Sequence, residues 1–168
     1  EAKSSFEKAA SLKDNGIAKN NLAATTIMDG NRTNTKKLIA QAKTAFDAKG
    51  DASQKTAVNY NLGILNIMDG KYAAADASFS ENSFNKALAQ VLAGKLDVAK
   101  KTLSGLSETA ETAYLKAIIS ARSGEGVDAV VSNLKVAISK NPAMKEKAAK
   151  DREFLKISTE ATFTNLVK

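Results

Sequence analysis

Apolar residues recur along most of this chain every three or four positions, the spacing that places side chains on one face of an α-helix. Residues 36–49 show such a face, made by Leu38, Ile39, Ala42, Ala45 and Phe46. The chain has one proline, few β-branched runs and abundant alanine, lysine and leucine, so helices are favoured over strands. The pattern predicts helices over 2–12, 17–29, 36–49, 54–69, 71–81, 84–93, 109–122, 127–140 and 142–150.

Polar and glycine-containing stretches between these segments indicate where the helices begin and end. The polar stretch 31–35 is expected to be a connection, and Gly50 is expected to end the helix over 36–49. A serine, threonine or asparagine before a helix can accept a hydrogen bond from an amide of its first turn. The expected N-caps are Asn34 or Thr35, Ser53 and Ser107.

The chain also contains an internal repeat. Residues 21–30 and 61–70 lie 40 positions apart and are identical at six of ten positions, including the Ile-Met-Asp-Gly that ends both. Two such copies indicate two similar structural units, and repeated units stack on their neighbours. The repeat therefore predicts a helical stack that follows the order of the sequence.

The second copy continues into a more specific pattern. Leu62-Gly63 is followed by Gly70-Lys71-Tyr72 and then by Ala75-x3-Phe79. Gly63 lets a partner helix approach closely, Ala75 offers a small surface and Phe79 fills the space beside the pair. This pattern resembles the tetratricopeptide repeat, a helix–turn–helix of about 34 residues. The surplus of the 40-residue offset is expected to lie in 31–35.

Further copies extend the resemblance from residue 2 to about residue 155. The second-helix spacing recurs in Ala2-x3-Phe6 and Ala42-x3-Phe46, a shorter variant spans Gly94–Leu103, and Asn141-Pro142 resembles the closing proline of a repeat. Together they indicate three and a half to four repeats. The first copy lacks its first helix, so a first helix and a signal segment are expected upstream of residue 1. This expectation favours the bacterial periplasm or cell envelope; an ordinary amphipathic N-terminal helix is the alternative.

The resemblance implies an all-α fold, a right-handed superhelical stack of antiparallel helix pairs of the α-α solenoid type. One repeat domain is expected over 1–156, with a capping helix over about 142–156 and a short turn from Asp151 through Leu155. The tail over 157–168 has no predicted structure.

Charge and chemistry narrow the function further. The net charge is +7, with +2 in residues 1–84 and +5 in residues 85–168. Lysines on solvated helix faces explain this excess, because a nucleic-acid surface would need a denser stripe interleaved with arginine or aromatic residues. The chain has no histidine or cysteine, and no apolar run of 18 residues. We therefore expect no enzyme, no cofactor, no metal site, no nucleic acid partner and no transmembrane segment.

In the family, the first helices of successive repeats line a concave groove that holds a partner peptide. The resemblance places eight positions on that groove: Asn20, Ala24, Tyr60, Ile64, Phe84, Leu88, Tyr114 and Ile118. They are almost all apolar, which argues against the basic clamp by which some members hold a chaperone tail. The rings of Tyr60, Phe84 and Tyr114 could also pack between neighbouring repeats, and residues 157–168 could occupy the groove.

The expected function is therefore a non-catalytic module that binds an unknown protein or peptide partner. The alternative is a structural or assembly spacer in a larger cell-envelope protein. A third possibility is binding of an anionic polymer or lipid through the lysine-rich stretch from Lys135 to Lys156.

Overall fold

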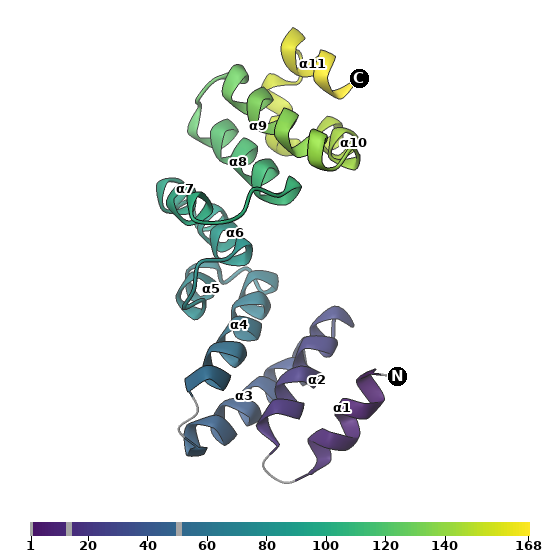
Figure 1. Ribbon diagram of the computed structural model, residues 1–168, viewed down its shortest axis with the longest axis vertical. Helices are drawn as coiled ribbons and strands as arrows, with labels where there is room; N and C mark the ends of the chain where they lie inside the picture. The colour runs from purple at the N-terminus through teal and green to yellow at the C-terminus, as the bar shows by residue number, and fades with distance from the viewer. Residues whose placement is uncertain (1, 13–14, 50–51) are drawn as a thin grey trace. The chain divides into compact units, whose positions relative to one another are not determined.

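The computed structural model describes residues 2–12, 15–49 and 52–168 (Figure 1). These residues form eleven α-helices and one 3-10 helix and contain no strand, which confirms the all-α prediction. The chain divides into two compact units, Glu1–Glu81 and Asn82–Lys168, called unit 1 and unit 2 below. The boundary lies inside the stretch that the sequence analysis treats as one domain.

Unit 1 contains five helices, each packed on the next in the sequence (Figure 1). They are α1 (Ala2–Ser11), α2 (Gly16–Met28), α3 (Arg32–Lys49), α4 (Ala52–Met68) and α5 (Tyr72–Ser78). The core is formed mainly by α2, α3 and α4, which bury Leu22, Ile39, Phe46, Val58 and Leu65 against one another. The helices α2 and α4 also contact each other directly.

Unit 2 contains the remaining seven helices. They are α6 (Phe84–Leu92), α7 (Leu96–Ser104), α8 (Ala110–Ser123), α9 (Val127–Lys140), α10 (Ala143–Lys150), η1 (Arg152–Ile157) and α11 (Ala161–Val167). One apolar cluster joins α6, α7 and α8, and a second joins α8 and α9 to the C-terminal helices. The tail left without a prediction thus contains α11, which packs on α9 and α10 and buries Phe163.

Four helices, α2, α4, α6 and α8, end in the same way, and we call them the first helices. Each is followed by a glycine in the left-handed region: Gly30, Gly70, Gly94 and Gly124, with φ between 69° and 77°. After α4, the Gly70 amide donates to the Ile67 carbonyl at 3.0 Å and the Lys71 amide to the Asn66 carbonyl at 2.8 Å. This is the Schellman motif, in which glycine is favoured because it has no Cβ.

A side-chain hydrogen bond then joins each first helix to the helix that follows, which we call its second helix. The residue four positions before each glycine is polar and bonds to a polar residue of α3, α5, α7 or α9. The pairs are Thr26–Thr35 at 2.8 Å, Asn66–Ser78 at 3.4 Å, Gln90–Thr102 at 2.8 Å and Ser120–Asn133 at 3.3 Å. These pair hydrogen bonds repeat along the chain although the residues that form them differ from one copy to the next. The sequence analysis does not predict them.

Ion pairs also connect α1, α3 and α7 to the end of the first helix that follows each of them. Lys36 of α3 lies 2.9 Å from Asp69, and Lys3 of α1 and Lys100 of α7 contact Asp29 and Glu125 respectively. The hydrogen bond from Lys36 lowers the pKa of the Asp69 carboxyl. The ion pairs follow the order of the helices, so they help to specify which helix packs on which.

The predicted contact at Gly63 is confirmed. A Cβ atom at Gly63 would lie 2.5 Å from Cζ of Phe79, so the ring occupies the space that a side chain would need. Phe79 is 3% exposed and Ala75 is fully buried. The close approach of α4 and α5 therefore rests on the residues that carry the repeat pattern.

The prediction for 31–35 is wrong. Asn31, and not Asn34 or Thr35, accepts the hydrogen bond of a first-turn amide, and α3 begins at Arg32. Thr35 is fully buried inside the helix, where it bonds to Thr26. The first copy of the repeat is longer than a family repeat because its second helix, α3, has 18 residues, whereas α5, the second helix of the next copy, has 7.

The alignment of α3 with the other second helices shifts accordingly. Counted from the preceding glycine, Thr35 and Ile39 correspond to Ala75 and Phe79, and all four are buried. The predicted match of Ala42-x3-Phe46 lies almost two turns later, where Phe46 packs against Gly16 at the start of α2.

Two other predicted caps are displaced. Ser53 lies inside α4, which begins at Ala52, so it is not the residue before that helix. Gly50, where the preceding helix was predicted to end, falls outside the described residues. Thr109, and not Ser107, caps α8: its hydroxyl accepts from the Thr112 amide and the Thr112 hydroxyl accepts from the Thr109 amide. A reciprocal capping box outcompetes a single serine because it satisfies two backbone amides at once.

Candidate functional site

The eight expected groove residues fall into two sets, one in each unit. Asn20 and Ala24 lie on α2, and Tyr60 and Ile64 lie on α4. The other four lie on α6 and α8 of unit 2: Phe84, Leu88, Tyr114 and Ile118. Within each unit the two first helices contact each other, so each unit is described by itself.

In unit 1, the polar member of the set is not on the surface. Asn20 is 6% exposed, and the side-chain amide of Asn61 donates to its Oδ1 at 2.8 Å. Ala24 and Ile64 are half-buried, whereas Tyr60 is 38% exposed and packs edge-to-face on Phe79 with ring centroids 5.3 Å apart. Ala24, Tyr60 and Ile64 form what we call the unit 1 face.

In unit 2, three members of the set are half-buried apolar side chains. Phe84, Leu88 and Ile118 pack by one side on the buried cluster of α6, α7 and α8 and leave the other side accessible. We call these three residues the unit 2 face. A face of this kind can bury further apolar surface of a partner, because part of each side chain still contacts water.

Tyr114 is a core residue, so it does not contribute to the unit 2 face. It is 3% exposed, its hydroxyl donates to Oδ2 of Asp151 at 2.8 Å, and its ring packs edge-to-face on Phe154 at 5.7 Å between centroids. Nζ of Lys147 lies 4.5 Å from the ring centroid. Burial, together with the hydrogen bond to Asp151, raises the pKa of the Tyr114 hydroxyl. Residues 147–154 cover this part of α8.

Arg122, which the sequence analysis does not single out, connects three elements of unit 2. Its Nε and Nη2 donate to the two carboxylate oxygens of Glu153 in η1, at 2.8 and 2.5 Å. Its Nη1 donates to the carbonyl of Val91 in α6 at 3.0 Å. Such a bidentate pair fixes orientation as well as contributing energy. Arg122 thus holds η1 and α6 on α8, and its function is structural.

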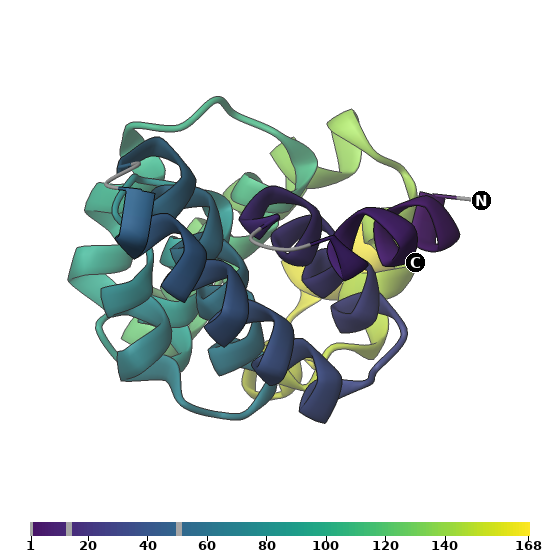
Figure 2. The ribbon, with the colours of Figure 1, turned by 90° about the horizontal axis from the view of Figure 1, so that it is seen from below.

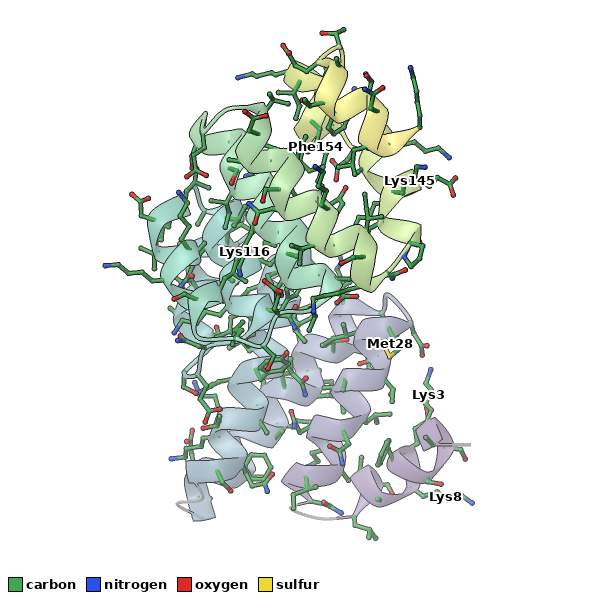
Figure 3. The ribbon with its side chains drawn as sticks, turned by 45° about the horizontal axis from the view of Figure 1, so that its top comes forward. Lys3, Lys8, Met28, Lys116, Lys145 and Phe154 are labelled. Carbon is green, nitrogen blue, oxygen red and sulfur yellow. The ribbon has the colours of Figure 1, made fainter. Side chains whose placement is uncertain are left out.

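Unit 2 contains at least two open clefts. The larger, about 510 Å³, runs between α9 and α11 and is lined by Asp128, Val131, Ser132, Lys135, Thr162, Asn165 and Leu166. The smaller, about 320 Å³, lies where α7, α8 and α9 meet and is lined by Lys100, Lys116, Ser120, Glu125 and Asn133. Lys116 projects from α8 in Figure 3.

The polar groups of the smaller cleft interact with one another. Lys100 contacts Glu125, and this hydrogen bond lowers the pKa of the Glu125 carboxyl. Asn133 donates to Ser120 at 3.3 Å, and Lys116 lies 3.9 Å from a carboxylate oxygen of Glu108. Since each group has a partner within the protein, the cleft presents no unsatisfied charge to a ligand.

No group of three or more histidine, cysteine, aspartate or glutamate residues that could hold a metal ion occurs among the described residues. No helix among them is long and apolar enough to cross a membrane. Comparisons of the chain with protein-family models, with curated proteins and with solved structures found no match.

Proposed function

We propose that this protein is a tetratricopeptide-like repeat protein, a right-handed superhelical stack of antiparallel helix pairs, that binds a protein or peptide partner and catalyses no reaction. The repeat architecture is supported by the four first helices, which share the Schellman glycine and the pair hydrogen bond. Such uniform ends are expected where one helix pair is repeated along a chain.

The observation that carries the binding proposal is the accessible apolar surface of the first helices. The unit 1 face and the unit 2 face occupy positions that the family uses for its partners, and both are made of half-buried or partly exposed apolar side chains. A partner would bury its own apolar side chains on these faces. The net charge of +7 would speed the encounter with an acidic partner.

The test is affinity capture from an extract of the native cell, with partners identified by mass spectrometry. We expect Ile64→Asp and Leu88→Asp to abolish capture of the specific partner, because a carboxylate on either face would be desolvated on binding. Val98→Asp is the matched control: Val98 lies on the second helix α7 and is 46% exposed. Circular dichroism and thermal unfolding verify that each variant is folded.

The second candidate is a structural spacer within a larger cell-envelope protein. The burial of Asn20 and Tyr114 favours it, because both side chains stabilise packing rather than face a partner. If the wild type and both face variants capture the same proteins, or none, the binding proposal is wrong and the spacer is favoured.

A further inference from the structure

The two clefts of unit 2 differ in whether their polar side chains are already bonded. In the smaller cleft, Lys100 contacts Glu125 and Asn133 donates to Ser120. In the larger cleft, between α9 and α11, none of the polar lining side chains has a hydrogen-bond or ion-pair partner within the described part of the chain. These side chains are Asp128, Ser132, Lys135, Thr162 and Asn165. Their charges, donors and acceptors are therefore available to a ligand.

Two neighbouring helices present these groups from opposite sides of the cleft. Asp128, Ser132 and Lys135 follow one another on α9 at spacings of four and three residues, so they share one face of that helix. Thr162 and Asn165 are three residues apart on α11, which packs on α9 (Figures 1 and 2). The cleft thus has one charged wall and one neutral polar wall.

The apolar residues between the two walls hold the cleft in shape. Val131 of α9 is 6% exposed and Leu166 of α11 is half-buried, and both line the cleft. Phe163, the residue after Thr162, is buried in the core that joins α11 to α8 and α9. The volume of about 510 Å³ lies within the range of about 300–1,000 Å³ that is usual for ligand sites. A ligand therefore meets a preformed cleft, which lowers the free-energy cost of binding.

The two charges define the chemistry of the ligand. Asp128 and Lys135 lie about two turns apart, so their Cα atoms are separated by about 10 Å along the helix axis. A ligand that pairs with both carries a cation and an anion at about that distance. An extended peptide advances by about 3.3–3.6 Å per residue, so the amino and carboxylate ends of a tripeptide are about 10 Å apart.

We infer that the cleft between α9 and α11 binds a short zwitterionic peptide of about three residues. Its amino group pairs with Asp128 and its carboxylate with Lys135. Thr162 and Asn165 donate to and accept from its amide groups, since a hydroxyl and a carboxamide can do both. The site is separate from the unit 1 face and the unit 2 face, so it is a second binding activity, for a small peptide with free ends.

The first test is titration of trialanine into the full chain, followed by the amide signals in nuclear magnetic resonance spectra. We expect saturable shifts in 128–135 and 162–166 with a Kd below about 1 mM. N-acetyl-trialanine lacks the cation and trialanine amide lacks the anion. Each change should weaken binding by about threefold to fivefold, which is the size of an exposed ion pair.

Two variants test which charge meets which end of the peptide. Asp128→Asn should bind trialanine and its N-acetyl form equally while it still discriminates against the amide, and Lys135→Gln should show the reverse. Lys116→Gln, in the smaller cleft, is the matched control and should keep both preferences of the wild type. Thermal unfolding by circular dichroism verifies that each variant is folded.

Three results would overturn the inference: no shifts at millimolar trialanine, shifts that lie outside the cleft, or equal binding of the free and blocked peptides by the wild type. None of these measurements involves the unit 1 face or the unit 2 face. The outcome of the capture experiment is therefore independent of this one, and the two proposals fail separately.

Discussion

The repeat pattern predicts a close contact between α4 and the end of α5, and the structure forms it between Gly63 and the ring of Phe79. The ring fills the space left by the missing side chain and also packs on Tyr60. Because Phe79 is 3% exposed, nearly all of its apolar surface is removed from water. The contact therefore buries apolar surface, and the Phe79 ring leaves no room for a side chain at position 63.

We expect Phe79→Ala to lower the free energy of unfolding by about 3–5 kcal/mol, because it removes a buried ring and leaves a cavity beside Gly63. Urea denaturation followed by circular dichroism measures the change, and the midpoint should fall with little change in slope. Val98→Ala, at a position 46% exposed, should change stability by less than about 0.5 kcal/mol. A loss no larger than that of this control would mean that the α4–α5 contact is not a core contact.

At the scale of elements, η1 is held on α8 by two different kinds of contact. Phe154 packs between Tyr114 and Phe163, and the Tyr114 hydroxyl donates to the Asp151 carboxylate. Burial raises the pKa of Tyr114, since an ionised phenolate inside the core and beside a carboxylate is unfavourable. The contact between η1 and α8 thus requires that Tyr114 stays protonated.

Because Tyr114 must stay protonated, the stability of the folded protein should decrease at alkaline pH. An unfolded tyrosine ionises near pH 10, and the folded pKa is higher, so the unfolded state loses its proton first as the pH rises. The stabilisation is complete below about pH 10 and is lost above it. We expect the urea midpoint of the wild type to fall more steeply between about pH 9 and 11 than that of Tyr114→Phe. Tyr72→Phe, in unit 1, is the control; equal slopes for wild type and Tyr114→Phe would contradict this expectation.

At the scale of the whole molecule, each unit has its own apolar core. The unit 2 clusters contain twelve and six buried residues, all from Asn82–Lys168. We expect residues 82–168 alone to unfold in one cooperative thermal transition, because these cores need no residue of unit 1. Calorimetry or circular dichroism measures it. A fragment that shows helical signal without a cooperative transition would mean that unit 2 depends on unit 1.

The helices themselves could be predicted from the sequence because their apolar spacing and glycine ends are local signals. The Gly63–Phe79 contact could be predicted for the same reason: both residues belong to one repeated pattern. The pair hydrogen bonds could not, because Gln90 and Thr102 show nothing in the sequence that would place them face to face. The start of α3 was missed because Asn31, Asn34 and Thr35 are all good N-caps, and the burial of Thr35 decides between them.

The candidate site was harder to predict than the helices. Tyr114 shares its place in the repeat with Tyr60, yet it is buried, since Asp151 and Phe154 follow it by about forty residues and return to α8. The spacing of apolar residues along one helix does not indicate which later segment of the chain will cover that helix. The apolar character of Ile64, Leu88 and Ile118 could be predicted, whereas their partial exposure depends on the packing of neighbouring helices.

The unequal anchoring of the two ends has a mechanical consequence. Phe154 and Phe163 fix the C-terminal helices of unit 2 in a core, whereas α1 holds no buried residue in unit 1. Under a stretching force applied to the termini, α1 would detach at low load and lengthen the chain before any core opens. The C-terminal end would resist until that core ruptures, so the protein would extend in discrete steps that begin at the N-terminus.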